Sequence, residues 1–248
     1  MILITRPLAQ SKNLKSLISK LGLEFELFPA FEINKINAKV PIQKYDVIIF
    51  ISVNAVEFGL DYFDNILIDP IKVFAIGPIT AKKLFEKSIK VDGYPEKNAS
   101  SKELLNVTYL KFLKDKKILI VRGCGGSETL KNNLQVNNQV NYLEVYDRVP
   151  CQLTQLHSES INNFMRSKDG VVIINSVESL LSVIKLVKKE SEAFLDIFKE
   201  SELIVFSERI KVQATKLGFK RIKVAFNPSD EDIIDILSAK KNKKITKI

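Results

Sequence analysis

The feature that most constrains the fold is a strand–serine–helix corner that the chain contains twice. Residues 47–58 read VIIFISVNAVEF, in which a buried strand leads through Ser52 into the start of a helix. Residues 171–184 read VVIINSVESLLSVI and repeat this arrangement around Ser176. Short apolar strands that alternate with helices are typical of parallel sheets covered by helices. The repeat therefore predicts an α/β protein with two domains of similar design.

Apolar periodicity and end signals indicate that strands and helices alternate along the whole chain. Strands are expected at residues 1–5, 23–33, 46–51, 72–77, 116–123, 139–149, 171–175, 202–207 and 221–225. Helices are expected at residues 8–21, 53–62, 78–85, 101–113, 127–134, 153–165, 178–187 and 208–217, and from residue 230. Ser229 with Asp232 predicts a capping box at the start of the last helix. Two distant copies of the corner favour two separate sheets over a solenoid.

Composition excludes several classes of protein. Hydrophobic residues make up 46% of the chain and charged residues 27%, which is typical of a soluble globular protein with a real core. No run approaches the roughly 18 apolar residues of a membrane span, and the first residues lack the pattern of a signal peptide. Cys124 and Cys151 are too few for a disulfide framework or a four-thiolate metal site. A reducing, cytoplasmic setting is therefore expected.

A net charge of +9 can attract a polyanionic partner, such as nucleic acid, acidic lipid or a small polyacidic substrate. The alternative is that the charge has no binding role, because part of the excess lies in the tail SAKKNKKITKI. This tail, residues 238–248, is expected to be solvated and frayed. No zinc-finger or RNA-recognition motif supports nucleic acid as a partner.

Four serines follow strands at positions where a helix is expected to begin: Ser52, Ser127, Ser176 and Ser207. The free N–H groups of a helix N-terminus, together with the helix dipole, can bind an anion. Each serine can equally be a simple N-cap with no ligand. Because ligands of open α/β sheets bind beyond the carboxyl ends of the strands, two facing sheets would line a cleft suited to several carboxylates or phosphates.

Other catalytic motifs are weak. Residues 122–128, RGCGGSE, resemble a glycine-rich phosphate loop but lack the third glycine of a dinucleotide motif. His157, the only histidine, is expected on the polar surface of its helix, so a Ser-His-Asp triad or a histidine metal site has little support. Any chemistry is therefore expected to depend on positioning and backbone hydrogen bonds.

Several short motifs occur in one order along the chain: Thr5-Arg6-Pro7, Ile51–Val56, Ala75–Ala81, Arg122-Gly123 with Glu128-Thr129-Leu130, Val145–Arg148 and Pro228-Ser229. In this order and spacing the chain resembles the uroporphyrinogen-III synthases, from about Ile2 to Leu237. The ordered set and the half-repeat are more specific than any one motif. The chain departs from the family at Ile51 and Asn175, which precede Ser52 and Ser176, and at Asp147, which precedes Arg148.

The resemblance implies two α/β domains, each a parallel sheet flanked by helices, joined by a two-stranded linker. The first domain would be discontinuous and contain residues 1–33 with residues 149–248. The second would contain residues 37–145. The linker strands would lie near residues 32–36 and 146–149.

The family consists of lyases, more narrowly hydro-lyases, of porphyrin, haem and tetrapyrrole biosynthesis. They cyclise hydroxymethylbilane, a linear tetrapyrrole with several carboxylates, to uroporphyrinogen III, with inversion of the last pyrrole ring and loss of water. The resemblance implies no cofactor, no metal, no membrane and no nucleic acid, and a monomer that makes at most a transient contact with the enzyme supplying the bilane.

Two other interpretations stay open at this point. One is a non-catalytic two-domain protein that binds a polyanionic small molecule in its interdomain cleft. The other is a nucleic-acid-binding or regulatory module, which is the weaker of the two because packed parallel sheets lack an obvious groove-reading element.

By motif match, Tyr146 corresponds to the family's linker tyrosine. Its phenol stays protonated at neutral pH, since its reference pKa is about 10, and can donate a hydrogen bond to the departing hydroxyl. The alternative is a tyrosine that only packs against the linker. Thr80, the second predicted catalytic residue, matches a threonine of the cleft, and its alternative is a first-turn helix hydroxyl. The predicted carboxylate-binding residues are Arg6, Ser52, Asn54, Gly77, Arg122, Gly123, Ser127, Ser176 and Ser207.

Overall fold

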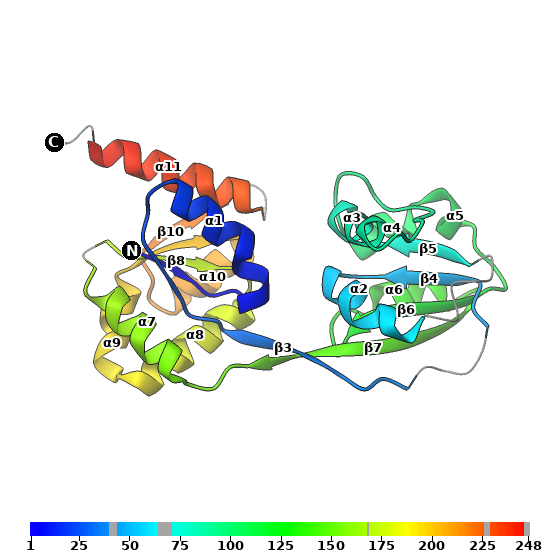
Figure 1. Ribbon diagram of the computed structural model, residues 1–248, viewed down its shortest axis with the longest axis horizontal. Helices are drawn as coiled ribbons and strands as arrows, with labels where there is room; N and C mark the ends of the chain where they lie inside the picture. Colours follow the sequence, from blue (N-terminus) through cyan, green and yellow to red (C-terminus); the bar gives the residue numbers. More distant parts are fainter. Residues whose placement is uncertain (40–43, 64–70, 168, 226–228, 246–248) are drawn as a thin grey trace. The chain divides into compact units, whose positions relative to one another are not determined.

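The computed structural model describes residues 1–39, 44–63, 71–167, 169–225 and 229–245, so Pro228 of the last motif lies outside the described residues. It contains two five-stranded sheets, each flanked by helices, which confirms the predicted α/β class (Figure 1). The chain divides into two compact units, which are Met1–Glu32 with Val149–Ile248 (unit 1) and Ile33–Arg148 (unit 2). Within the described ranges, no helix has the length and apolar composition that a membrane crossing requires.

Unit 1 is built around a parallel sheet with the order β10-β9-β8-β1-β2. Its strands are β1 (Ile2–Ile4), β2 (Phe25–Leu27), β8 (Val171–Ile174), β9 (Glu202–Val205) and β10 (Arg221–Val224). Its helices are η1 (Leu8–Ser11), α1 (Lys12–Lys20), α7 (Gln155–Met165), α8 (Val177–Glu190), α9 (Glu192–Lys199), α10 (Glu208–Lys216) and α11 (Asp230–Ile245).

The central strands β1 and β8 of unit 1 are apolar on both sides because helices cover both faces of the sheet. Successive residues of a strand point to opposite faces. Leu3 and Val172 accordingly belong to the core that α7, α8, α9 and α10 complete. Ile4 and Ile173 belong to the opposite core, which α1 and α11 complete.

Unit 2 repeats this design with the order β3-β7-β6-β4-β5. Its strands are β3 (Phe31–Lys35), β4 (Val47–Phe50), β5 (Lys72–Ala75), β6 (Lys117–Gly123) and β7 (Gln139–Pro150). Its helices are α2 (Val53–Gly59), η2 (Leu60–Tyr62), α3 (Pro78–Glu86), α4 (Ser101–Leu105), α5 (Thr108–Lys111) and α6 (Thr129–Leu134). Ile48 and Leu119 pack with α2 and α3, whereas Ile49 and Ile120 pack with α4, α5 and α6.

The parallel pairing in unit 2 brings the ends of four strands to one edge. β4 pairs in parallel with β5 and with β6, and β6 pairs in parallel with β7. The two boundaries between the units, at residues 32/33 and 148/149, fall within β3 and β7. These are the segments for which the family resemblance predicts linker strands.

Some helices differ from the sequence prediction. The helix expected at residues 101–113 is two short helices, because the backbone at Val107 is extended and separates α4 from α5. The helix α9 was not predicted. It begins after an extended residue, Ser191, and it buries Phe198 in the core of unit 1.

The expectation of a frayed tail is wrong as far as Ile245, because α11 continues to that residue. Ser229 Oγ caps the start of this helix by accepting a hydrogen bond from the backbone N–H of Asp232 at 3.2 Å. Near the other end, Lys240 forms an ion pair with Glu202, and Lys241 donates to the carbonyl of Leu21 at 2.7 Å. Two lysines of the tail that was expected to be frayed therefore hold α11 against the rest of unit 1.

The expectation of a surface histidine is also wrong. His157 is 1% exposed, and its ring lies edge-on against Phe28. Its Nε2 lies 2.9 Å from the carbonyl oxygen of Pro29, so this nitrogen donates. Its Nδ1 then accepts from Thr154, whose hydroxyl lies 2.7 Å away, in a capping box at the start of α7. The histidine is a packed, hydrogen-bonded part of the core.

Glu202 supports a stability prediction for unit 1. Burial raises the pKa of this carboxyl, but hydrogen bonds from Lys223 and Lys240 outweigh burial and leave the pKa below its ordinary value of 4.5. Because the folded pKa is the lower one, the stabilisation is present above about pH 4.5 and is lost as the pH falls through the folded pKa. Glu202→Gln should lower the free energy of unfolding at pH 7 by about 1–3 kcal/mol.

The measurement is urea unfolding followed by circular dichroism at pH 7 and at several acidic pH values. The difference between wild type and Glu202→Gln should shrink as the pH falls. Glu200→Gln is the matched control, because Glu200 forms an exposed pair with Lys220 and should matter little. A difference that stays constant down to the most acidic pH would contradict the prediction.

Candidate functional site

Four predicted site residues lie on or directly after neighbouring strands of unit 2, at one edge of the sheet. Ser52 lies after β4, Gly77 lies after β5, and Gly123 ends β6. Tyr146 lies on β7, opposite Gly123 in the strand register. Because parallel strands end at the same edge of a sheet, these residues gather at one edge, where ligands of α/β sheets bind.

The hydroxyl groups of Tyr146 and Ser52 are 3.1 Å apart, which is hydrogen-bond distance. Ser52 is also the N-cap of α2, and its Oγ accepts from the backbone N–H of Ala55 at 2.9 Å. Ser52 is therefore an N-cap, which is one of the two roles that the sequence left open, and it also contacts the predicted catalytic tyrosine, which the sequence did not predict. The ring of Tyr146 also lies near Phe58, with 6.1 Å between ring centroids.

Gly123 allows the ring of Tyr146 to lie directly on the backbone of β6. A Cβ at position 123 would come within 2.5 Å of Tyr146 Cζ, so any side chain would displace the ring. The register between β6 and β7 shifts after Arg122, and this irregularity places Gly123 opposite Tyr146. The N–H of Cys124 then donates to the carbonyl of Tyr146 at 2.8 Å and holds the two strands together beyond the shift.

Gly77 and Thr80 lie at the start of α3. Gly77 precedes Pro78, and a Cβ there would come within 3.0 Å of Ala99 Cα and closer still to Ala99 Cβ. The glycine therefore permits the segment before α4 to approach. Thr80 is 4% exposed in the first turn of α3, and its catalytic role stays a prediction. Asn54 lies in the first turn of α2 and is partly exposed.

Ser127 does not cap a helix. The N-cap residue of α6 is Glu128, and Ser127 lies in the loop before it. Its Oγ lies 2.8 Å from Thr129 Oγ1 and accepts from the N–H of Thr129 at 3.2 Å. The expected helix corner at Ser127 is therefore wrong, because the loop after β6 continues to residue 128.

Arg122 is buried among groups of its own unit, with its side chain 2% exposed. Its Nη1 lies 2.9 Å from Glu128 Oε1, and its guanidinium carbon lies 4.3 Å from the centre of the Tyr142 ring. Burial and the hydrogen bond to Glu128 raise the pKa of Tyr142 to about 12. The hydrogen bond from Tyr142, followed by that from Arg122, lowers the pKa of Glu128. Sequence reasoning assigned no role to Tyr142 or Glu128.

The remaining predicted residues follow adjacent strands of unit 1. Ser176 follows β8 and caps α8 by accepting from the N–H of Ser179 at 3.0 Å. Ser207 follows β9 and caps α10 by accepting from the N–H of Ile210 at 3.4 Å. Arg6 follows β1, where it forms an ion pair with Asp230 and lies over the ring of Phe206.

Two buried polar atoms at this edge of unit 1 lack a partner. Arg6 Nε and Asn175 Oδ1 have no hydrogen-bond partner among the described residues. They belong to residues that follow β1 and β8, which are neighbours in the sheet. Because buried polar atoms are nearly always hydrogen-bonded, one unpaired donor and one unpaired acceptor at a sheet edge favour a ligand there.

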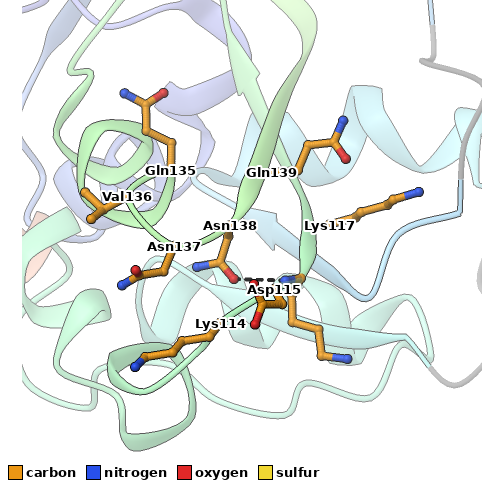
Figure 2. Close-up of a pocket in the computed structure, with 9 residues that line it drawn as sticks. Lys114, Asp115, Lys117, Gln135, Val136, Asn137, Asn138 and Gln139 are labelled. Atoms are coloured by element: carbon orange, nitrogen blue, oxygen red, sulfur yellow. Dashed lines mark hydrogen bonds between the residues drawn. The ribbon is translucent and has the colours of Figure 1, made fainter.

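A polar groove of about 600 Å³ lies at the opposite edge of the sheet of unit 2. It is formed by the two loops that precede β6 and β7, residues 114–117 and 135–139 (Figure 2). Its side chains are lysines and amides, together with Asp115 and Val136. None of the predicted site residues lines this groove, so the site described above does not depend on it. No group of three or more metal-ligating residues occurs among the residues that the structure describes.

Comparisons with known proteins agree on one family. The family model described as uroporphyrinogen-III synthase HemD matches residues 12–235. The chain is 28% identical to the uroporphyrinogen-III synthase of Escherichia coli K12, over 95% of this chain and 99% of that protein. The crystal structure of uroporphyrinogen-III synthetase from Helicobacter pylori 26695 is similar in fold, with a TM-score of 0.64, 17% identity and coverage of 96% of this chain and 98% of that one. A mutant uroporphyrinogen III synthase from Thermus thermophilus has a TM-score of 0.57, with 15% identity over 98% of this chain and 99% of that one.

Gly123→Ala should displace the ring of Tyr146 and break its hydrogen bond to Ser52, because the added Cβ overlaps the ring. The measurement is the NMR signal of the Tyr146 ring in protein labelled at tyrosine, assigned with a Tyr146→Phe variant. The free energy of unfolding should also fall by about 1–3 kcal/mol.

Gly125→Ala is the matched control for this prediction. A Cβ at position 125 would meet nothing within 4 Å, so only the cost of its positive φ of 70° applies, about 1–2 kcal/mol. The Tyr146 signal should stay in place in this variant. An unchanged Tyr146 signal in Gly123→Ala would contradict the role assigned to Gly123.

Proposed function

Because this chain belongs to the uroporphyrinogen-III synthase family, we propose that residues at the carboxyl ends of its strands bind hydroxymethylbilane and direct its cyclisation. The family assignment covers residues 12–235 and gives the chain uroporphyrinogen-III synthase activity, a hydro-lyase activity of tetrapyrrole biosynthesis.

The pair formed by Tyr146 and Ser52 is the observation that supports the catalytic role most directly. Ser52 Oγ already accepts from the N–H of Ala55, so its own proton is available to donate to the Tyr146 oxygen. In that arrangement the phenol O–H is free to donate to the substrate. Ser52 thereby orients the donor, and Gly123 fixes the ring that carries it.

The reaction needs orientation more than a strong acid or base. The substrate supplies its own leaving hydroxyl, which departs with a proton as water and leaves an electron-poor azafulvene. The substituted carbon of the last pyrrole then attacks the azafulvene at the carbon that carried the hydroxyl. A spiro intermediate forms, and the last ring is inverted. In this proposal Tyr146 donates a hydrogen bond to the departing hydroxyl, and the remaining contacts hold the chain of pyrroles in the reactive conformation.

Backbone N–H groups in first helical turns are the proposed ligands of the substrate carboxylates. The first turns of α3 in unit 2 and of α8 and α10 in unit 1 begin directly after strands and supply such donors. At the edge of unit 1, the free Nε of Arg6 can donate to a carboxylate, and the free Oδ1 of Asn175 can accept from a pyrrole N–H. We further propose that the protein acts as a monomer and receives the bilane in a transient contact with the enzyme that supplies it.

The direct test uses purified protein and freshly generated hydroxymethylbilane, followed by oxidation and separation of the porphyrin isomers. Without enzyme, the bilane closes to the type I isomer. Type III should dominate in proportion to the protein added. If folded protein yields only type I, the catalytic proposal fails, and binding of the bilane without turnover would identify a polyanion-binding protein instead.

Tyr146→Phe should lower kcat by about 10- to 100-fold, because one hydrogen-bond donor to the leaving group is removed while the ring is kept. The measurement is the rate of type III formation at saturating bilane. Tyr109→Phe is the matched control, since Tyr109 is an exposed tyrosine of the same unit that stacks on Phe74. Full activity of Tyr146→Phe would assign Tyr146 to the packing alternative.

A further inference from the structure

Arg122 is closed off from any ligand by the groups around it. Its Nε donates to the carbonyl of Gly123 at 3.1 Å, and its Nη1 donates to Glu128 Oε1 at 2.9 Å. Glu144 Oε1 lies 3.8 Å from Nε, and the ring of Tyr142 covers the guanidinium at 4.3 Å. A buried guanidinium is costly unless such partners surround it, so these contacts explain how a cation 2% exposed is tolerated at the end of β6.

The partners of Arg122 lie at both ends of one loop, residues 123–128. Gly123 begins the loop at the end of β6, and Glu128 ends it at the start of α6. Between them, Gly125 and Gly126 have positive φ angles of 70° and 94°. A Cβ at Gly126 would come within 3.1 Å of Arg122 Nη2, so the loop passes close to the guanidinium. One side chain therefore holds the loop at its beginning and its end.

Glu128 is held from a second direction. The hydroxyl of Tyr142 donates to Glu128 Oε2 at 2.8 Å, while Arg122 binds Oε1. Both oxygens of the carboxylate are thus bonded, one to a cation and one to a phenol that also stacks on that cation. Charge-assisted hydrogen bonds of this kind are stronger than neutral ones, and they fix the carboxylate in one orientation.

The loop contacts Tyr146, the predicted catalytic residue, at the same place where Arg122 binds the loop. The carbonyl that Arg122 binds belongs to Gly123, the residue on whose backbone the ring of Tyr146 lies. The next residue, Cys124, donates its N–H to the carbonyl of Tyr146. A shift of the loop would therefore move both the surface under the ring and the backbone of Tyr146.

We propose that Arg122, with Glu128 and Tyr142, is a positioning residue that fixes the Tyr146 hydroxyl through the loop 123–128, and that it does not bind substrate. This inference rests on the proposed function, in which the Tyr146 hydroxyl assists the reaction. It replaces the carboxylate-binding role that was predicted for Arg122 from the sequence. A substrate ligand would contribute to binding independently of Tyr146, whereas a positioning residue acts only through it.

Two variants weaken the cluster formed by Arg122, Glu128 and Tyr142, each by changing a different member. Arg122→Lys keeps the positive charge but cannot bond Gly123 and Glu128 in the same way. Glu128→Gln changes a half-exposed carboxylate, so it should fold even if a change at the buried Arg122 does not. Each should lower kcat by about 5- to 20-fold, since a small displacement of a catalytic group costs this much, and KM should change by less than about 3-fold.

The deciding experiment is a double-mutant cycle with Tyr146→Phe, measured as the rate of type III formation. In the Tyr146→Phe background, Glu128→Gln and Arg122→Lys should each cost less than about 2-fold more, because they act through the missing hydroxyl. If the rate of each double variant falls by the product of the two single-variant decreases, the two residues act independently and the proposal is overturned. A rise in KM for Arg122→Lys with unchanged kcat would also overturn it and would restore Arg122 as a substrate ligand.

A readout that does not use activity separates this proposal from the proposed function. The ring signal of Tyr146 in tyrosine-labelled protein should shift in Glu128→Gln and in Arg122→Lys. It should stay in place in Lys131→Gln, which removes a second cation near the Tyr142 ring but leaves the hydrogen bonds of Glu128 to Arg122 and Tyr142 intact. If wild type forms no type III isomer, the proposed function fails by itself. An unmoved Tyr146 signal in both cluster variants overturns the positioning role.

Discussion

The contact between the Tyr146 ring and the backbone of Gly123 is the constraint on which the predicted site of unit 2 depends. Because residue 123 has no side chain, the ring can lie against the end of β6. From there its hydroxyl reaches Ser52 at the end of the neighbouring strand β4. Three neighbouring strands thus supply a surface, a phenol and the hydroxyl that orients it. An edge of parallel strands makes this possible, since their carboxyl ends meet in one place.

The buried cation beside this contact has a structural cause as well as a consequence. The register shift after Arg122 leaves the end of β6 without regular pairing, and the guanidinium bonds the carbonyl of Gly123 there. Burying the cation requires a carboxylate, which Glu128 supplies from the end of the loop. The hydrogen bonds that make burial of the cation tolerable therefore also hold the loop at both of its ends. In this account, the position of the Tyr146 hydroxyl depends on the contacts that bury the guanidinium of Arg122, one residue before Gly123.

Much of the fold could be predicted from the sequence because its signals are local. The runs VIIF at β4 and VVII at β8 and the capping serines Ser52, Ser176 and Ser207 identify strand–helix corners directly. The errors have tertiary causes. His157 lies in a polar stretch but is buried by Phe28 and Pro29, which are distant in sequence. Arg122 resembles a free cation until the strand register places Tyr142 and Glu144 on the adjacent strand.

The central claim is that the ligand is bound by segments following the carboxyl ends of the strands. Hydrogen exchange of the backbone amides, measured under anaerobic conditions with and without uroporphyrinogen III, tests it most directly. The account predicts slower exchange with ligand in the first turns of α2 and α3 and in residues 123–128 of unit 2, and in the first turns of α8 and α10 of unit 1. Slower exchange confined to the groove of residues 114–117 and 135–139, at the amino ends of β6 and β7, would contradict it.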